Sequence, residues 1–433
     1  MASTAPTSVD IRAYNVGFGD CLLVSFKYAS GDRHILIDFG STSLPDKRPA
    51  GNHMERIAKR IATDSGNKLT AVVATHRHKD HISGFAMTGG KGTGAIIRDL
   101  RPEVVLQPWT EDPALARDAT APVKKSGPKA RARLWAGSLA DMNQYACYAA
   151  SVAKHLEEPH LAAARAQLAF LGDDNDLTNR SAIVNLMTMG RRPPKYLFAG
   201  ADSGLEALLP GVKVHVLGPP TLEQDDRISN QTDTNPSEFW ATRANFWAKR
   251  GAIAKTTKKA NAPIFPRQAL SDVPWDARWY RYHAQRELAE SMLSIVRTLD
   301  KQMNNTSLIL VFEIGGTCLL FPGDAQWENW RYALSQKANV ELLSRVNVYK
   351  VGHHGSRNAT PKSLWNKFVN RGTKTKPHRL TTVMSTKDDV HGDSVETAVP
   401  RQTLVDALEK NSNLIDTRST GADSLCRLES IQL

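Results

Sequence analysis

The sequence predicts an α/β fold in which two similar β-sheets face one another. Residues 9–110 alternate short apolar segments with helical ones, a pattern typical of α/β proteins. Two hairpins, at residues 15–40 and 304–325, each end with an acidic residue at the tip of a buried strand. This weak internal repeat predicts that the two sheets bring their loops together at one edge.

The first part of the chain contains the elements of one sheet. The opening hairpin has expected strands at residues 15–24 and 34–40, and a helix is expected near 54–64. Residues 69–75 form a short β-branched run typical of a buried strand, and a further strand is expected at 103–107. The residues after position 75 therefore follow the carboxyl end of a strand, where the sites of α/β proteins usually lie.

Two insertions are expected in the middle of the chain. Residues 111–178 are alanine-rich with a helical pattern, and residues 221–303 begin polar and contain tryptophans and many basic side chains. The second insertion ends in an amphipathic helix at 288–299. Strands are expected between the insertions, at residues 181–186, 196–200 and 212–217.

The C-terminal part repeats the hairpin pattern. Strands at 304–312 and 317–321 meet at a Gly-Gly pair, and a strand at 348–351 precedes further polar residues. The tail predicts a strand at 381–385, a helix near 401–411 and a last short strand.

Residues 76–81, with the sequence His-Arg-His-Lys-Asp-His, are the most informative segment. Two imidazoles two residues apart in an extended or turning segment face the same side, and an aspartate followed by a histidine can face a second position. This layout predicts a site for two neighbouring metal cations. Imidazole and carboxylate suit zinc, manganese or iron, so the spacing does not select the metal. The alternative is a solvated histidine-rich loop.

Together with later segments, this stretch resembles the metallo-β-lactamase superfamily, whose signature is His-x-His-x-Asp-His. Residues 304–308 read Asn-Asn-x-Ser-Leu, residues 321–325 read Phe-x-Gly-Asp-Ala, and residues 350–356 read Lys-Val-Gly-His-His-Gly-Ser. These three motifs resemble one branch, the C-terminal hydrolase domain of ComEC-type DNA-uptake channels and their soluble relatives.

The resemblance covers about residues 9–110 and 304–410, with a short stretch near 210–220. It implies a four-layer αββα sandwich. Residues 1–433 are then a single metallo-β-lactamase-like domain with two mainly helical insertions.

The resemblance also implies a dinuclear centre of imidazoles and carboxylates. The first two histidines of residues 76–81 bind one metal, and the aspartate and last histidine bind the other. A later aspartate bridges both, and one of two adjacent histidines completes the second site; the second of that pair is favoured because a Gly-Ser turn follows it. The expected ligands are His76, His78, Asp80, His81 and Asp324, with either His353 or His354.

Two cations about 3.5 to 4 Å apart would hold a hydroxide between them and stabilise an in-line displacement. Zinc is the favoured metal and manganese the alternative. Asp38 matches the family's structural aspartate and is expected to orient a ligand histidine or the metal loop, although an ordinary strand-end turn has the same residues. His391 is a candidate proton donor to the leaving group, as is a histidine in the uptake-protein relatives.

One position departs from the family pattern. In this branch a histidine before proline often supplies the third protein ligand of the first metal, and here Gly218 precedes Pro219. The first site is therefore incomplete unless a water or an insertion residue replaces the ligand. His215 is nearby, but it lies within the expected strand and is read as a packed or surface residue.

Three polar residues after the histidine pair are candidate phosphate contacts. Ser356, Asn358 and Thr360 precede Pro361, where a helix is expected to begin. Hydroxyls, an amide and free backbone N–H groups at a helix start suit a phosphate. Helix capping needs the same residue types and is an equal alternative.

The 56 basic and 44 acidic residues give a formal charge of +12, and a basic chain can attract polyanions. Basic clusters occur at 124–133, at 243–259 among tryptophans and a phenylalanine, and at 371–379. The second mixture suits a nucleic-acid backbone and base stacking, and the alternative is a solvated basic loop.

At 41% hydrophobic residues the chain can bury a large core, and no run approaches the roughly 20 apolar residues needed to cross a bilayer. The polar start lacks the regions of a signal peptide, and the four cysteines form no Cys-x-x-Cys pair. We expect no membrane association, reduced thiols and a cytoplasmic location.

The leading functional hypothesis is a metal-dependent phosphodiesterase, a nuclease acting on DNA or RNA. The first alternative is a hydrolase of small esters, phosphoesters or lactones, since one fold supports many substrates. The second is a catalytically degenerate binding or scaffold module that contacts a protein partner through its helical insertions. The sequence leaves the oligomeric state open.

Overall fold

A computed structural model describes most of the chain outside the two expected insertions. The chain divides into two compact units, one formed by residues 1–124, 178–229 and 303–433 and the other by residues 125–177 and 230–302. Both β-sheets belong to the first unit. The described residues are 5–49, 51–113, 121–122, 162, 180–226, 279, 283, 286, 303–356, 360–390, 398–421 and 424–433.

The insertion predictions fall almost entirely on residues outside this set. The helical segment expected at 111–178 and the basic segment expected at 221–303 are described only at their margins and at a few single positions. The amphipathic helix expected at 288–299 and the basic clusters at 124–133 and 243–259 also lie outside the described residues.

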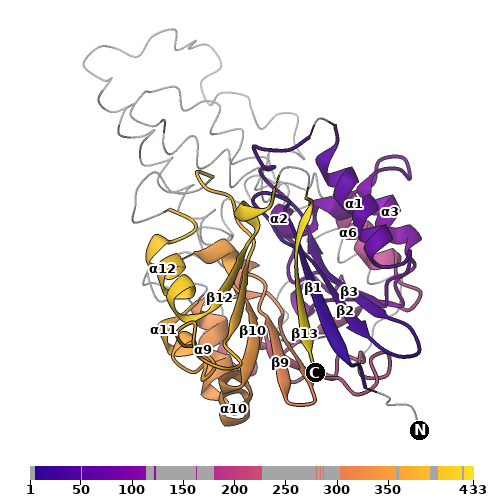
Figure 1. Ribbon diagram of the computed structural model, residues 1–433. Helices are drawn as coiled ribbons and strands as arrows, with labels where there is room; N and C mark the ends of the chain where they lie inside the picture. The colour runs from indigo at the N-terminus through magenta and orange to yellow at the C-terminus, as the bar shows by residue number, and fades with distance from the viewer. Residues whose placement is uncertain are drawn as a thin grey trace. The chain divides into compact units, whose positions relative to one another are not determined.

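The first sheet has seven strands in the order β13-β1-β2-β3-β4-β5-β6 (Figure 1). Strands β1, β2, β3 and β13 pair antiparallel, whereas β3, β4, β5 and β6 pair parallel. The strands are β1 Ser8–Tyr14, β2 Cys21–Lys27, β3 Arg33–Phe39, β4 Ala71–Val73, β5 Val104–Pro108, β6 Lys195–Leu197 and β13 Cys426–Gln432.

The second sheet has six strands in the order β12-β11-β10-β9-β8-β7. Strands β7, β8 and β9 pair antiparallel, and β9 to β12 pair parallel. The two sheets are therefore mixed and the fold is α/β. The strands are β7 Lys213–Gly218, β8 Ile309–Ile314, β9 Thr317–Phe321, β10 Val346–Lys350, β11 Thr381–Met384 and β12 Asn413–Asp416.

The main core lies between the sheets. Alternate residues of β1, β2 and β3 enter it, such as Val24 and Phe26, because successive strand side chains point to opposite faces. Phe312 and Phe321 enter it from the second sheet, and the Phe26 and Phe312 rings lie 5.7 Å apart. Facing apolar strands thus fix the two sheets against each other, as the hairpin repeat predicts.

Helices cover the outer faces of both sheets (Figure 1). Trp330, Leu343, Trp365 and Leu408 pack from four helices against the outer face of the second sheet. The helices are α1 His53–Asp64, α2 Lys79–Ile82, α3 Thr93–Asp99, α6 Arg180–Thr188, α9 Trp327–Ser335, α10 Lys337–Ser344, α11 Lys362–Trp365 and α12 Gln402–Asn411; the 3₁₀ turns are η1 Ser83–Phe85, η2 Trp109–Glu111, η7 His353–Gly355 and η8 Thr417–Ser419.

Two expected elements are wrong. The strand expected at 181–186 is helix α6, in which the buried Asn185 amide donates to Phe85 O at 2.9 Å and Gly94 O at 3.0 Å. The strand expected at 15–24 begins only at Cys21, because Gly17 takes a φ of 85° in a turn that leaves no room for a Cβ. Residues 15–20 are consequently a loop that reaches the carboxyl edge of the sheets.

In the described part of the chain, no helix has the length and apolar character needed to span a lipid bilayer.

Candidate metal centre

The loop that follows β4 is held against the strand end of β3. Asp38 accepts hydrogen bonds from the Thr75 backbone N–H and from Thr75 Oγ1, both at 2.7 Å. His78 then takes extended backbone and starts helix α2, which contains Asp80 and His81. The carboxylate at the tip of β3 therefore fixes where residues 76–81 leave the sheet.

Four buried residues from distant parts of the chain meet at this edge. Asp20 precedes β2, His81 lies on α2, Asp324 follows β9, and His354 follows β10. One ligand atom from each of these four residues lies within 4.8 Å of the others. This group can hold a metal ion, since imidazole nitrogen and carboxylate oxygen are the usual ligands of zinc and related divalent metals.

Asp324 lies at the centre of the group. Its Oδ2 is 3.1 Å from His81 Nε2, 3.6 Å from His354 Nε2 and 3.9 Å from His353 Nε2. Asp80 lies against the same cluster, with its Oδ2 2.9 Å from His354 Nε2. The structure thus brings together the expected ligands Asp80, His81, Asp324 and His354.

His76 and His78 form a second, adjacent donor set. His76 Nε2 and His78 Nδ1 are 2.9 Å apart, and both side chains are buried. The His76 ring centroid lies 4.1 Å from that of His81. The two expected first-site histidines therefore face each other directly beside the carboxylate group.

His81 and His354, the two inner imidazoles, are each oriented through Nδ1, the ring nitrogen that points away from Asp324. His81 Nδ1 lies 2.8 Å from Asp38 Oδ2, and His354 Nδ1 lies 3.0 Å from Ser385 O. A backbone carbonyl can only accept, so His354 Nδ1 carries a proton. Hydrogen bonds of this kind leave Nε2 as the atom presented to a metal. Asp38 thus contacts both His81 and Thr75, the ligand histidine and the loop.

Asp20 and Lys350 are functional candidates that the sequence interpretation missed. Lys350, 1% exposed, donates from Nζ to Asp20 Oδ2, and Nζ lies 3.9 Å from Asp324 Oδ1. The backbone N–H of Asp20 donates to Asp80 O at 2.9 Å. Lys350 opens the motif at residues 350–356 and Asp20 lies in the expected hairpin, so their basic and acidic types were the available signal. A lysine with a nearly zero exposed fraction needs a buried carboxylate partner, but a sequence does not show which residue that is.

The carboxylates shift the protonation of the inner imidazoles. Burial lowers the pKa of His81, but the charges of Asp324, Asp80 and Asp38 outweigh it and raise the pKa well above its ordinary value. For His354 burial is likewise outweighed, and the pKa is raised. In turn, burial raises the pKa of Asp324, yet His81 and His354 lower it well below its usual range.

The pKa values of His76 and His78, the two outer imidazoles, shift in the opposite direction. Burial, followed by the neighbouring His81 and His78, lowers the pKa of His76 well below its ordinary value. Burial also lowers the pKa of His78 to about 4, against the opposing effect of Asp80. His76 and His78 are therefore neutral at pH 7, the form that binds metals.

The two adjacent histidines have different surroundings. His354 is fully buried, whereas the His353 side chain is 26% exposed and its Nδ1 lies 2.9 Å from Ser356 Oγ. Both take positive φ, 43° and 51°, in the left-handed region that non-glycine residues seldom adopt. This backbone turns both rings toward Asp324, with His354 nearer and His353 at the rim.

The remaining predicted site residues are only partly brought to the centre. Ser356 contacts His353, but Thr360 Oγ1 lies 2.8 Å from the Tyr349 hydroxyl within the packed interior. Asn358 and His391 lie outside the described residues. His215 Nε2 lies 2.9 Å from Glu313 Oε2 on the neighbouring strand, consistent with its reading as a surface residue.

The space beside Gly218 is already filled. A Cβ at position 218 would lie 2.1 Å from Asn329 Oδ1, and the Asn329 amide donates to Asn305 O at 3.1 Å and Ser307 O at 2.9 Å. Asn329 is fully buried. No side chain at 218 fits unless Asn329 moves, so this last residue of β7 supplies no third imidazole.

Three buried polar atoms in the centre form no hydrogen bond with any described residue: Asp20 Oδ1, Asp80 Oδ1 and His81 Nε2. His81 Nε2 does have a charged neighbour, Asp324 Oδ2 at 3.1 Å. Buried polar atoms are nearly always hydrogen-bonded, so such a concentration requires a compensating group. A cation bound among two carboxylate oxygens and an imidazole nitrogen satisfies all three atoms, and the residues present therefore fit a metal ion.

Comparison with known proteins adds no further assignment: no protein-family model matches the chain, and neither does any curated protein sequence.

Proposed function

We propose that this protein is a metal-dependent hydrolase that cleaves phosphodiesters. The supporting observation is the buried group of Asp20, Asp80 and His81, in which Asp20 Oδ1, Asp80 Oδ1 and His81 Nε2 form no hydrogen bond with any described residue. Asp324 and His354 complete the group. Structural ion pairs do not need this arrangement, because their donors and acceptors satisfy each other.

The residues divide into two donor sets, and we propose two divalent metals. Asp20, Asp80, His81 and His354 would hold one ion, His76 and His78 the other, and Asp324 lies between them. Zinc is the favoured metal and manganese the alternative. A divalent ion bound there supplies Lewis acidity and lowers the pKa of a water ligand toward neutrality.

The protein's own residues prepare and bound this site. Asp38 and Ser385 O keep the His81 and His354 rings oriented, so only the Nε2 protons must leave when a metal binds. Lys350 balances part of the carboxylate charge from within the site. His353 stands at the partly exposed rim with Ser356 and is placed to hydrogen-bond a substrate.

A nucleic acid is the proposed substrate, with a small phosphodiester as the alternative. The formal charge of +12 favours polyanions over neutral esters. A protein partner, if one is used, is proposed to bind through residues 111–178 or 221–303. We further propose a cytoplasmic location, because Cys21, Cys318 and Cys426 are free thiols.

The test compares Asp324→Asn with Asp99→Asn, a change at an exposed position on α3. Each protein is loaded with zinc or manganese and assayed on bis-p-nitrophenyl phosphate, single-stranded DNA, duplex DNA and RNA. We expect Asp324→Asn to reduce kcat/KM about 1000-fold or more, because a ligand between both donor sets is lost. Asp99→Asn should match the wild type, and metal content is measured by mass spectrometry.

The same experiment separates the alternatives. Activity on bis-p-nitrophenyl phosphate without activity on any nucleic acid would support the small-ester hydrolase. Bound metal without turnover of any substrate would support a degenerate binding module, which the filled space at Gly218 favours. Undiminished hydrolysis by Asp324→Asn would exclude the proposed centre.

A further inference from the structure

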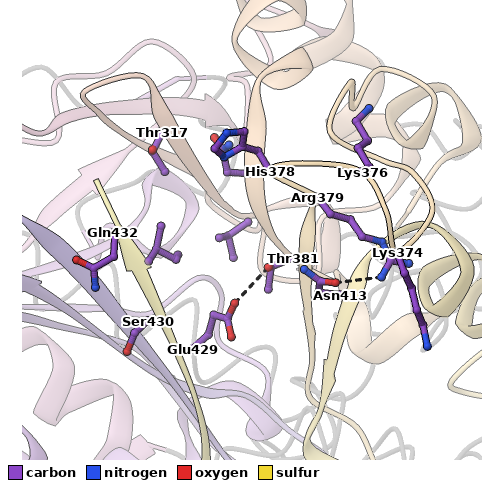
Figure 2. A pocket seen from close by; sticks show the side chains of 13 residues that line it. Thr317, Lys374, Lys376, His378, Arg379, Thr381, Asn413, Glu429, Ser430 and Gln432 are labelled. Carbon is purple, nitrogen blue, oxygen red and sulfur yellow. Dashed lines mark hydrogen bonds between the residues drawn. The ribbon is translucent and has the colours of Figure 1, made fainter.

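A separate open cleft lies at the other ends of the same strands. Thr317, Val348, Thr381 and Asn413 line it from the amino-terminal parts of β9, β10, β11 and β12 (Figure 2). Asp324 and His354 of the candidate metal centre instead follow the carboxyl ends of β9 and β10. The last strand of the first sheet, β13, closes the opposite wall with residues 429–432, and the cavity volume is about 410 Å³.

The charge of the lining favours an anion. Lys374, Lys376 and Arg379 are permanent cations, and Glu429 is the carboxylate that faces them, which leaves an excess of two positive charges. His378 adds a ring nitrogen to the same wall. This volume is within the range of small-molecule sites and larger than a phosphate ion needs.

Two of these cations build the wall. Arg379 donates to Asn413 Oδ1 at 3.0 Å and to the carbonyls of Glu409 and Lys410 at the end of α12 (Figure 2). Lys376 Nζ donates to Arg371 O at 2.9 Å. Loop 371–379 is therefore hydrogen-bonded to α12 and within itself, so the Arg379 and Lys376 side chains are held in fixed positions before a ligand binds.

The other groups are available to a ligand. Lys374 Nζ, the His378 ring and the Thr317 hydroxyl form no hydrogen bond with described residues, and Lys374 and His378 are exposed. His378 has a φ of 52°, an uncommon left-handed conformation for a side-chain-bearing residue. Glu429 Oε1 is engaged by Thr381 Oγ1 at 3.3 Å.

We propose that this cleft binds a small phosphomonoester. A phosphomonoester carries a charge of about −1.5 to −2 at pH 7, which matches the excess of two positive charges in the lining. Lys374 supplies a charged hydrogen-bond donor to the phosphate oxygens. On the other side of the cleft, the His378 ring and the Thr317 hydroxyl can hydrogen-bond the organic portion, and Val348 and Ile431 form an apolar part of the wall. The site is distinct from the metal centre and does not depend on the proposed hydrolase activity.

Binding is measured by isothermal titration calorimetry on the full chain in EDTA, so that phosphate does not bind through a metal. The probes are inorganic phosphate, glycerol 3-phosphate and adenosine 5′-monophosphate, with adenosine as the uncharged comparison. The variants are Lys374→Gln and Glu429→Gln, and Lys367→Gln removes an exposed charge that does not line the cleft.

We expect the phosphomonoesters to bind saturably and more tightly than inorganic phosphate, and adenosine not to bind. Lys374→Gln should weaken binding about tenfold, because a charged hydrogen bond is lost. Glu429→Gln should tighten it, since the amide keeps an acceptor for Thr381 but removes the repelling charge. Lys367→Gln should leave the affinity unchanged.

Opposite effects of two lining substitutions cannot arise from a general loss of folding. Equal weakening by Lys374→Gln and Lys367→Gln would show nonspecific charge attraction and overturn the proposal. The absence of saturable binding by all three probes would overturn it as well. Equal affinity for an oligonucleotide with and without a 5′-phosphate, and none for the small probes, would assign the cleft to a phosphodiester backbone instead.

Discussion

The two ends of the second sheet use charged residues in opposite ways. At the carboxyl end, Asp20, Asp324 and Lys350 are each 1% exposed, and Lys350 Nζ pairs with one oxygen of each carboxylate. At the amino end, Lys374 is exposed and makes no hydrogen bond with described residues. Strand β10 connects the ends, since Val348 lines the cleft and Lys350 reaches the centre.

This difference shows that burial, more than residue type, decides what a lysine does. A buried ammonium must be paired, because leaving water costs several kcal/mol. An exposed ammonium keeps its hydration and can exchange it for a ligand's charge. The carboxyl end therefore keeps its charges buried in a group that could hold a cation, whereas the amino end presents an exposed ammonium to solvent.

Lys350→Met compared with Lys374→Met tests this contrast with one substitution at both ends. Removing the buried Lys350 ammonium leaves the Asp20 carboxylate without its hydrogen-bonded cation, which should lower the free energy of unfolding by about 3–5 kcal/mol. Lys374→Met should change it by less than about 0.5 kcal/mol, because an exposed side chain is removed. Urea denaturation of metal-free protein measures both values.

Equal stability of the two variants would contradict the contrast. An ammonium that contributed only packing would also be replaced by Met at little cost, so a Lys350→Met change within 1 kcal/mol of wild type rejects the ion-pair role. A circular dichroism spectrum in dilute buffer confirms that each variant is folded at the start.

Gly218→Ala tests how tightly the carboxyl end is packed. The added Cβ meets Asn329 Oδ1 at 2.1 Å, and Asn329 is tied to two carbonyls. Overpacking of this kind should reduce the free energy of unfolding by about 1–3 kcal/mol. Gly421→Ala, whose added Cβ meets nothing within 4 Å, is the control. If thermal unfolding shows no difference between them, Asn329 moves freely and position 218 can accept a side chain.

The strands and the metal loop were the parts most readily predicted from the sequence. The apolar run at residues 69–75 is buried and contains β4, and the expected ligands His81 and Asp324 meet although they follow strands of different sheets. These features follow from local pattern and motif spacing. The order of strands within each sheet does not, because it depends on tertiary pairing.

The missed features share a physical cause. Asp20, Lys350 and Asn329 act through partners that are distant in sequence, and polar type alone does not reveal such partners. The segment at 181–186 was taken for a strand because a short apolar run fits either element, and Asn185 holds it as a helix against Phe85 and Gly94. The amino-end cleft was missed because its residues come from several strands.

A histidine at the amino end of the first sheet should give the smallest effect, a change in pH dependence. His34 Nδ1 lies 2.8 Å from Ser25 Oγ, and burial lowers its pKa to about 4, in contrast to the raised pKa of His81 at the carboxyl end. An ordinary histidine has a pKa of about 6.5, so between pH 6.5 and 4 the unfolded chain binds a proton at His34 that the folded chain does not. Stability therefore falls as the pH drops through this window and is unaffected by His34 above it.

His34→Gln removes this titrating group. The slope of the unfolding free energy against pH should decrease by an amount that corresponds to less than one bound proton, measured by urea denaturation in EDTA from pH 7.5 to 4. An unaltered slope in His34→Gln would mean that His34 is protonated in the fold.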